Sequence, residues 1–280
     1  MSDFILIPPD FDPAETLDCG QAFRWEEKDG LWQGIAMGRK LSLAKEGEYL
    51  RLDCTQEEFD NIWKHYFDLD TDYNKIKERI SAIDPVLKEA VSYAPGIRIL
   101  RQDPWEAICS FIISQNNNIP RIKGIIKRFC ELFGEEVADG LYSFPTAEAI
   151  SRLTVEDLAP IRSGFRAKYI IAAAQKIAGD ENFIPSVYSL PIDEARKALQ
   201  TIKGIGPKVA DCALLYGFHR TDCFPVDVWM KRAMEVLLPT HTPESFGLDA
   251  GMAQQYIFHY SRMHPELFPD KASDKKSDKK

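Results

Sequence analysis

The chain has 280 residues, of which 45% are hydrophobic, and a formal net charge of −8. This length suffices for two or three packed cores, and no apolar run is long enough to span a membrane, so we expect a soluble, intracellular protein. Six cysteines, at positions 19, 54, 109, 130, 212 and 223, form no CxxC pair, which argues against a zinc site or an iron–sulfur cluster.

The first part of the chain has a strand pattern. Residues 22–54 alternate short apolar runs with tight turns such as Asp29-Gly30, which is typical of an antiparallel sheet. Thr55 then begins a helix, because Thr55 and Glu58 have the spacing of a capping box. Two further helices are predicted over residues 73–83 and 85–93.

After residue 93 no segment has a clear strand pattern. Helices are predicted over residues 103–115, 119–133, 165–178, 192–202, 207–218, 228–238 and 248–263, and a short helix is predicted to begin at Thr154 with Asp157. The chain is therefore predicted to be an α+β protein. An antiparallel sheet unit spans residues 1–95, an all-helical region spans residues 96–270, and residues 271–280 form a disordered, lysine-rich tail.

The segment 199–229 carries the strongest functional signal. Gly204-Ile205-Gly206 separates two predicted helices, and Pro207 suits the first position of the second helix. Two glycines so close together allow the backbone N–H groups at a helix start to approach a phosphate, although such turns are as often plain connectors.

The distribution of charge also bears on phosphate binding. Residues 121–232, which contain this segment, hold a small excess of basic residues, whereas most of the acidic residues lie outside them. We therefore expect phosphate binding by a turn and not by a broad basic face.

Lys208 and Asp227 follow this turn. A lysine is most often a solvated side chain, but it becomes a nucleophile when burial or the positive end of a helix favours its neutral form. Asp227 precedes an apolar helix and is expected to be its N-cap. A fixed carboxylate also suits the electrostatic stabilisation of a cationic transition state, with general base as the second interpretation.

The segment GIGPKVADC, followed by PVDVW, resembles the helix-hairpin-helix glycosylases known as the HhH-GPD superfamily, and within it the 8-oxoguanine DNA glycosylases. The resemblance extends from residue 17 to residue 258. It implies a TBP-like antiparallel sheet followed by a two-lobed helical body, with Lys208 as nucleophile and Asp227 as the catalytic carboxylate. Gly204 and Gly206 would bind phosphate in the hairpin. It also implies a possible structural cation on the carbonyls of Gln200, Ile202 and Ile205, and no required cofactor or metal.

The same resemblance implies a pocket for the lesion base. Cys212 lies four residues after Lys208, on the same helical face, and would pack against one face of the extruded base, although a small core residue is an equally good interpretation. Gln254 and Phe258, also four residues apart, would pair with the base and stack on it. Gly20, in a segment ending GQAFRW, would accept through its carbonyl the proton that N7 carries in 8-oxoguanine and lacks in guanine.

A second group of residues is expected to face the duplex. Asn116 and Arg121, in NNNIPR, resemble the residues that fill the gap left by the extruded nucleotide and read the widowed cytosine, whereas a loop cap is the plain interpretation of such asparagines. Phe165 and Arg166 resemble a segment with tyrosine in place of Phe165, and a phenylalanine can still act as a wedge beside a base step. Trp229 stands where animal-type relatives have histidine.

These patterns predict a bifunctional DNA glycosylase and AP lyase that excises 8-oxoguanine from double-stranded DNA, expected opposite cytosine. We expect a monomer that does not bind membranes and that, in a bacterium, lies in the cytoplasm or nucleoid. Two alternatives stay open: a monofunctional glycosylase for alkylated bases, which would need Asp227 and water but not Lys208, and a non-catalytic DNA-binding module.

Overall fold

A computed structural model describes residues 4–8, 11–138 and 140–268 of the chain. Its larger sheet is antiparallel and has the strand order β1-β5-β4-β3-β2. The strands are β1 (Ile5–Ile7), β2 (Trp25–Lys28), β3 (Leu31–Ala36), β4 (Arg39–Glu46) and β5 (Tyr49–Leu52). The predicted sheet is confirmed, with an additional edge strand, β1, whose three residues are too few to form a recognisable alternation. The predicted tail at 271–280 lies outside the described residues.

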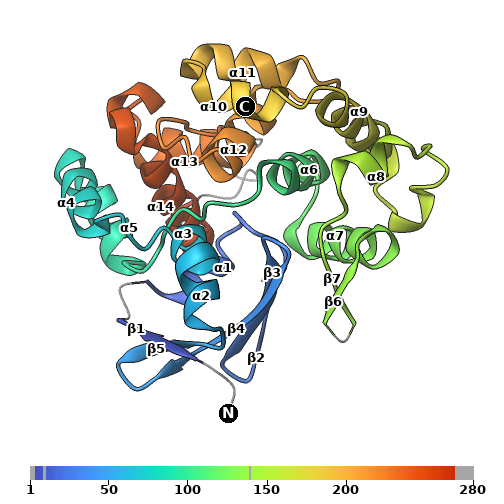
Figure 1. Ribbon diagram of the computed structural model, residues 1–280. Coiled ribbons are helices and arrows are strands. Elements are labelled where there is room, and N and C mark those ends of the chain that lie inside the picture. The colour runs from blue at the N-terminus through green and yellow to red at the C-terminus, as the bar shows by residue number, and fades with distance from the viewer. Residues whose placement is uncertain (1–3, 9–10, 139, 269–280) are drawn as a thin grey trace, which may run out of the picture.

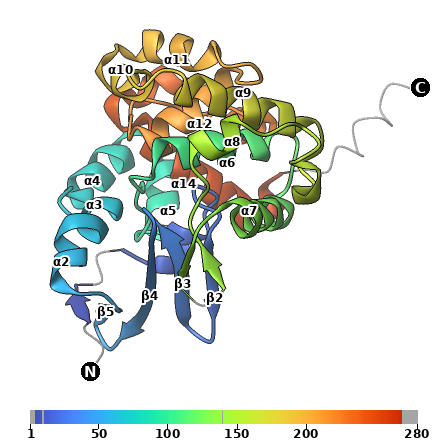
Figure 2. The ribbon, with the colours of Figure 1, turned by 45° about the vertical axis from the view of Figure 1, so that its right-hand side comes forward.

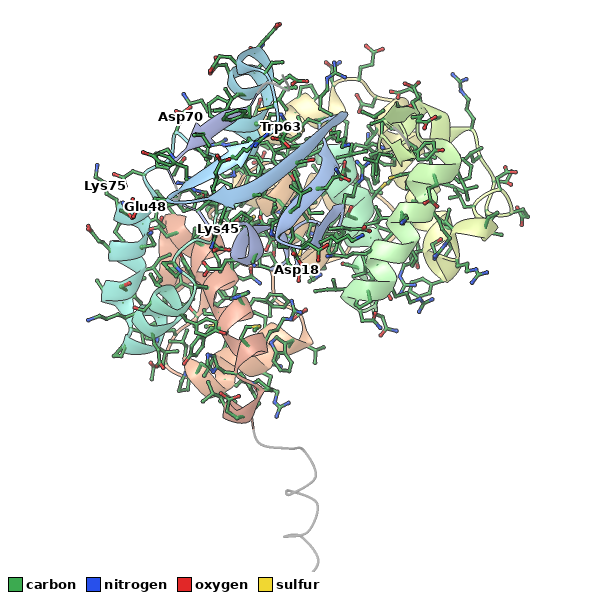
Figure 3. The ribbon with its side chains drawn as sticks, turned by 90° about the horizontal axis from the view of Figure 1, so that it is seen from below. Asp18, Lys45, Glu48, Trp63, Asp70 and Lys75 are labelled. Carbon is green, nitrogen blue, oxygen red and sulfur yellow. The ribbon has the colours of Figure 1, made fainter. Side chains whose placement is uncertain are left out.

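Short helical segments pack on this sheet: α1 (Pro13–Leu17), the π-helical turn η1 (Phe59–Trp63), which follows α2 (Gln56–Glu58), and α3 (Lys64–Tyr66). The next two helices, α4 (Tyr73–Ile83) and α5 (Pro85–Tyr93), belong to the larger, helical core instead. The capping box of Thr55 and Glu58 forms as predicted. An aromatic cluster of Trp25, Trp63 and Phe67 fills the core between sheet and helices. Seen from below, the sheet lies in front of the helices, and Trp63 lies against it (Figure 3).

The rest of the chain is mainly helical and forms the larger core. Its α-helices are α6 (Pro104–Ser114), α7 (Ile119–Phe133), α8 (Ala147–Ser151), α9 (Ala167–Ala178), α10 (Phe183–Ser189), α11 (Ile192–Gln200), α12 (Pro207–Gly217), α13 (Val228–Leu237) and α14 (Ala250–Met263). The 3-10 turns are η2 (Ala159–Ile161), η3 (Gly164–Arg166), η4 (Pro243–Asp249) and η5 (Pro265–Leu267). In Figure 1, α13 and α14 lie on one side and α7, α8 and α9 on the other, with α6 and α12 between them. Figure 2 shows the sheet below this helical body.

Some predictions for this region are wrong. A short hairpin of β6 (Glu136–Ala138) and β7 (Leu141–Tyr142) interrupts the helices, and its strands are too short to show a strand period. Thr154 and Asp157 do exchange hydrogen bonds, but only turns and η2 follow them, so the predicted helix start is wrong. The helices α8 and α10, with five and seven residues, also gave no clear helical period.

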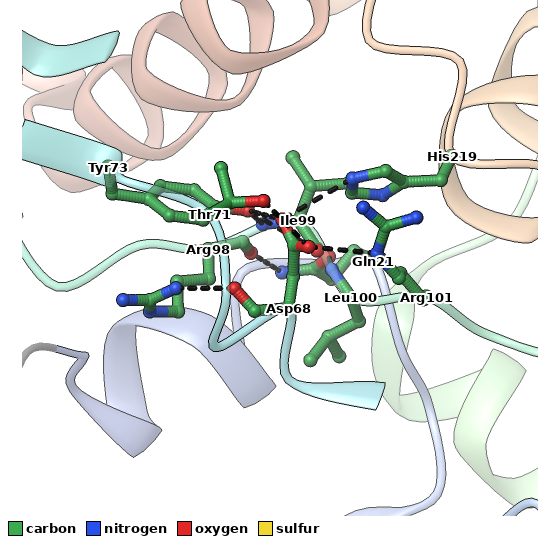
Figure 4. A network of polar contacts seen from close by, with 9 residues as sticks. All are labelled: Gln21, Asp68, Thr71, Tyr73, Arg98, Ile99, Leu100, Arg101 and His219. Carbon is green, nitrogen blue, oxygen red and sulfur yellow. Dashed lines mark hydrogen bonds and ion pairs between the residues drawn. The ribbon is translucent and has the colours of Figure 1, made fainter. Parts of the chain in front are cut away.

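A buried carboxylate joins the sheet unit to the helical body (Figure 4). Asp68, which follows α3 and is 3% exposed, accepts hydrogen bonds from Arg101 Nε at 2.8 Å, Tyr73 Oη at 2.9 Å and Thr71 Oγ1 at 2.9 Å. His219 Nε2, just beyond the end of α12, lies 3.3 Å from Oδ2 of the same carboxylate. The sheet unit is therefore tied by side chains to the helix that begins at Pro207.

Gln21 provides a second tie between the same parts. Its Nε2 donates to the Arg98 carbonyl at 2.7 Å, and its Oε1 accepts from the Leu100 amide at 2.9 Å. Gln102 Nε2 in turn donates to the Gln21 carbonyl at 2.7 Å. Since Gln21 directly follows Gly20, these bonds fix the backbone at one of the predicted site residues.

Candidate active site

The predicted hairpin lies between α11 and α12. Gly204 has a φ of +94°, and a Cβ at this position would lie only 2.2 Å from a ring carbon of Tyr169, so glycine is required here. Gly206 has extended backbone and open space around it, and it is the N-cap of α12, with Pro207 at the first helical position as predicted. The N–H groups at the start of α12 therefore face a surface that a phosphate can reach.

Lys208 lies in the first turn of α12 and is partly buried. Its Nζ lies 3.4 Å from Ser114 Oγ and 5.5 Å from the centroid of the Phe111 ring, both on α6. Within the described part of the chain, no carboxylate forms an ion pair with this amine. The amine is thus held against a hydroxyl and an aromatic face, and it is not neutralised by a carboxylate.

Asp227 is the N-cap of α13, as predicted, and its Oδ1 accepts a hydrogen bond from the Met230 amide at 2.7 Å. This bond fixes the carboxylate at the start of the helix, where the helix dipole favours a negative charge. Asp227 and Lys208 line the same cleft, together with Gly20, Phe258 and other residues. The structure therefore places the predicted nucleophile and the predicted anion in one concave site.

All four residues predicted to bind the lesion base meet in a small pocket that adjoins this cleft. The pocket is lined by Gly20, Phe111, Lys208, Cys212, Tyr216, Pro225, Asp227, Gln254 and Phe258. These residues come from the segment before β2, from α6, from α12 with the loop that follows it, and from α14, and the first and last of them are separated by most of the chain. Their roles toward a base stay predictions, but their proximity is observed.

Gly20 and Phe258 lie close together in the lining of this pocket. Gly20 has a φ of +89°, and a Cβ there would lie 3.3 Å from the Phe258 ring. The neighbouring Cys19 carbonyl accepts a hydrogen bond from Gln255 Nε2 at 3.0 Å, which ties the Gly20 segment to α14. Tyr216 Oη donates to Gln255 Oε1 at 2.6 Å and lies 3.4 Å from Gln254 Oε1. These hydrogen bonds fix the Gly20 segment, α12 and α14 relative to one another.

Cys212 is buried beside Lys208. Burial raises the pKa of its thiol to about 11, although the nearby Lys208 amine opposes that rise. The thiol is therefore neutral near pH 7 and presents a polarisable, apolar surface to the pocket. This environment fits a packing surface for a base better than a source of thiolate.

The asparagine loop follows α6 and is held by Arg166. Arg166 is 2% exposed and donates to the carbonyls of Gln115, Ser163 and Asn116, the last at 2.9 Å. Asn116 itself is exposed and has a φ of +47°, a conformation that asparagine tolerates better than most residues. Arg166 therefore fixes the conformation of the loop. Its predicted contact with the opposite base would use the N–H groups that do not already donate to these carbonyls.

A wider groove continues from the cleft past this loop. Its lining includes Asn116, Phe165, Gly206, Val228, Lys231 and Arg232. Phe165 is 51% exposed, and Val228 is 83% exposed. Exposed apolar side chains beside cations suit contact with bases and backbone of a nucleic acid. Arg121 is exposed at the start of α7 but does not line the cleft, the pocket or the groove.

Several residues of the site had no signal in the sequence. Ser114 and Phe111 contact Lys208, and Arg262 lines the cleft with its guanidinium 5.5 Å from the Phe258 ring. A serine at a helix end and a phenylalanine in an apolar helix have no distinguishing pattern.

Trp229 lines both the cleft and the groove. Its Nε1 donates to Ser261 Oγ at 2.8 Å, so its ring is fixed against α14.

Side chains provide no evident metal site. Among residues 4–8, 11–138 and 140–268, no cluster of three or more His, Cys, Asp or Glu side chains could hold a metal ion. The predicted cation on the carbonyls of Gln200, Ile202 and Ile205 is a different kind of site and stays a prediction.

No helix among residues 4–8, 11–138 and 140–268 is long and apolar enough to cross a membrane.

Comparison with known families covers most of the chain. Residues 5–108 match a family described as 8-oxoguanine DNA glycosylase, N-terminal domain, and residues 109–245 match one described as HhH-GPD superfamily base excision DNA repair protein. The N-glycosylase/DNA lyase of Saccharomyces cerevisiae is 35% identical over 250 residues, which are 78% of this chain and 66% of the yeast protein. The chain thus spans about two thirds of this relative's length.

Two solved structures are similar over nearly the whole chain. MBOgg1, solved in complex with a low affinity DNA ligand, is 42% identical with a TM-score of 0.89, covering 94% of this chain and 96% of its own. The 8-oxoguanine glycosylase/lyase of Clostridium acetobutylicum, in complex with double-stranded DNA containing cytosine opposite 8-oxoguanine, is 36% identical with a TM-score of 0.86. That alignment covers 95% of this chain and 100% of the Clostridium chain.

Proposed function

The chain belongs to the 8-oxoguanine DNA glycosylase family within the HhH-GPD superfamily of base excision repair proteins, and on that premise we propose that it is a bifunctional enzyme. It excises 8-oxoguanine from double-stranded DNA and then cleaves the strand at the abasic site. The observation that carries this proposal is the position of Lys208 and Asp227 in one cleft, next to the pocket that contains Gly20, Gln254 and Phe258.

The chemistry at the sugar follows from these two side chains. The target nucleotide must first leave the base stack, because its C1′ is not accessible in the duplex. The neutral amine of Lys208 then attacks C1′, the glycosidic bond breaks, and the base departs with its bonding electrons. The carboxylate of Asp227 stabilises the positive charge that develops on the sugar. The attached nitrogen then loses a proton, and the C1′–O4′ bond of the sugar ring breaks as O4′ takes up a proton, which gives the Schiff base. Loss of a proton from C2′ of this Schiff base expels the 3′ phosphate, which cleaves the strand.

The pocket supplies the choice of base. The Gly20 carbonyl accepts the proton on N7 that distinguishes 8-oxoguanine from guanine, and the positive φ of Gly20 allows that backbone to approach closely. Gln254 pairs with an edge of the base. Phe258 and Cys212 pack on its two faces, and stacking on an aromatic ring contributes about 1–3 kcal/mol per base.

The rest of the site holds the duplex. Gly206 and the N–H groups at the start of α12 bind a phosphate, while Gly204 makes the turn possible. Asn116 enters the gap left by the extruded nucleotide, and Arg121 with Arg166 reads the opposite cytosine. Phe165 wedges beside that base. We expect the enzyme to act as a monomer on such duplexes.

Trapping with borohydride tests the proposal. Incubation with a duplex containing 8-oxoguanine opposite cytosine should give a covalent protein–DNA complex, because borohydride reduces the Schiff base to a stable amine. Lys208→Gln should abolish that complex, whereas Lys197→Gln, an exposed lysine on α11, should trap as the wild type does. Base release without trapping would indicate a monofunctional glycosylase, and binding without release would indicate a non-catalytic DNA-binding module. Either outcome would overturn the proposal.

A further inference from the structure

Ser114 is the polar side chain that contacts the Lys208 amine from α6. The two residues are separated by 94 positions in the sequence, yet Nζ lies 3.4 Å from Ser114 Oγ. Ser114 also lines both the cleft and the groove on either side of Lys208. Ser114 therefore lies where it can set the orientation of the Lys208 amine toward a substrate in the cleft.

The direction of this hydrogen bond is determined by the geometry of Ser114. Its hydroxyl donates to the Phe111 carbonyl at 2.8 Å, so only its lone pairs face Lys208. The amine must then donate one N–H to Ser114. A neutral amine has two N–H groups and one lone pair, and fixing one N–H on Ser114 prevents the lone pair from pointing at α6. The lone pair is thus directed away from α6 and toward the cleft.

Ser114 is itself rigidly held. It is the last residue of α6, whose residues 107–113 are all buried, and Phe111 on the same face is 3% exposed. On its other side, the carbonyls of Gln115 and Asn116 accept hydrogen bonds from the buried Arg166. A fixed acceptor can orient the flexible side chain of a lysine, and such orientation is an important part of catalysis by proximity.

We propose that Ser114 is a positioning residue for Lys208, which fixes the rotation of the amine so that its lone pair points at C1′ of the extruded nucleotide. This inference rests on the proposed function of Lys208 as the nucleophile. Phe111 contributes a face that limits where Nζ can move, and Ser114 supplies the directional contact. Ser114 does not touch the substrate in this assignment.

Single-turnover trapping with saturating enzyme tests the proposal. Ser114→Ala should slow formation of the borohydride-trapped complex on the order of tenfold, which is the loss expected from one hydrogen bond to an amine. Binding to a duplex with a tetrahydrofuran abasic analogue, which cannot react, should stay within about twofold of the wild type. Ser110→Ala, one turn earlier on α6 and outside the cleft, should leave the trapping rate unchanged.

Ser114→Thr and Ser114→Val provide a matched pair, since they have the same shape and differ only in the hydroxyl. Trapping within about threefold of the wild type for the threonine variant, and the slow rate for the valine variant, would support the proposal. Equal rates for the two would overturn it, as would an unchanged rate for Ser114→Ala. A wild-type enzyme that forms no trapped complex would instead refute the proposed function, so the two failures are distinguishable.

Discussion

Gly20 combines a backbone requirement with a predicted role in recognising the base. Its φ of +89° is a conformation that residues with a side chain rarely adopt, and a Cβ would lie 3.3 Å from the Phe258 ring. Left-handed backbone costs a residue with a Cβ roughly 1–2 kcal/mol. Any substitution here would therefore both strain the backbone and displace the ring that we expect to stack on the base.

Gly20→Ala is predicted to separate recognition of the base from the chemistry at the sugar. Excision of 8-oxoguanine should fall at least about tenfold, the effect of losing one contact of about 1.4 kcal/mol in the transition state. Strand cleavage at a preformed abasic site should change much less, because that substrate has no base to recognise. Single-turnover rates on the two duplexes measure this. Equal losses on both would show that Gly20 supports the fold around Lys208 and does not act on the base.

The residues of the pocket differ in how far the sequence could predict them. Gln254 and Phe258 are four positions apart on one helix, so their common face follows from helical geometry. Their proximity to Gly20, at the other end of the chain, was predicted only through a family resemblance. Ser114 was not predicted, because its contact with Lys208 depends on how α6 packs against α12, and local sequence patterns do not determine such packing.

At the scale of elements, the hairpin between α11 and α12 contains two glycines whose backbone conformation and surroundings differ. Gly204→Ala would place a Cβ 2.2 Å from a ring carbon of Tyr169, so the turn would have to open. We expect a loss of stability of about 2–3 kcal/mol from overpacking and backbone strain, together with weaker binding of DNA. Thermal unfolding and a DNA titration measure the two effects.

Gly206→Ala is the matched control for that change. Gly206 has extended backbone, and a Cβ added there would meet no atom within 4 Å, so the melting temperature should stay close to that of the wild type. DNA binding should nevertheless weaken, because a methyl group at the N-cap of α12 keeps a phosphate away from the N–H groups. Normal binding by Gly206→Ala would contradict the proposed phosphate contact, and a normal melting temperature for Gly204→Ala would contradict the steric argument.

The elements that the sequence predicted well share strong local signals. α6, α12 and α13 each begin with a cap or a first-turn proline followed by an apolar period, and their observed starts agree with prediction. The hairpin of β6 and β7 and the short helices α8 and α10 have too few residues for an apolar period to repeat clearly. They form because the larger core covers their apolar side chains, and that core is known only once the chain is folded.

At the scale of the whole molecule, the tie between sheet unit and helical body depends on Asp68. Burial alone would raise the pKa of this carboxyl, but the hydrogen bonds and charges of His219 and Arg101 outweigh burial and hold the pKa at about 2, against an ordinary value of 3.8. No sequence pattern marked Asp68, whose partners come from three separate segments (Figure 4). Its role in joining the two predicted units could not be predicted from the sequence, because it depends on tertiary contacts with Arg101 and His219.

The lowered pKa of Asp68 predicts how acid affects stability. A carboxyl whose pKa is lower in the folded state stabilises the fold above its unfolded pKa, and that contribution is lost as pH falls toward the folded pKa. The Asp68 carboxylate should therefore contribute on the order of 2 kcal/mol near neutral pH, and this should disappear between about pH 4 and pH 2. Denaturant unfolding of the wild type and Asp68→Asn across this range measures the contribution as a difference in the free energy of unfolding.

Asparagine is suited to this test, because Asp68 has a φ of +53° and asparagine tolerates that conformation, so the variant removes the charge without straining the turn. Asp70→Asn is the control: Asp70 pairs with Lys64 at 2.8 Å on the surface, where such pairs contribute little (Figure 3). Its stability should stay within about 0.5 kcal/mol of the wild type at every pH. If Asp68→Asn instead loses the same amount at pH 3 as at pH 7, the ionised carboxylate is not what joins the two parts.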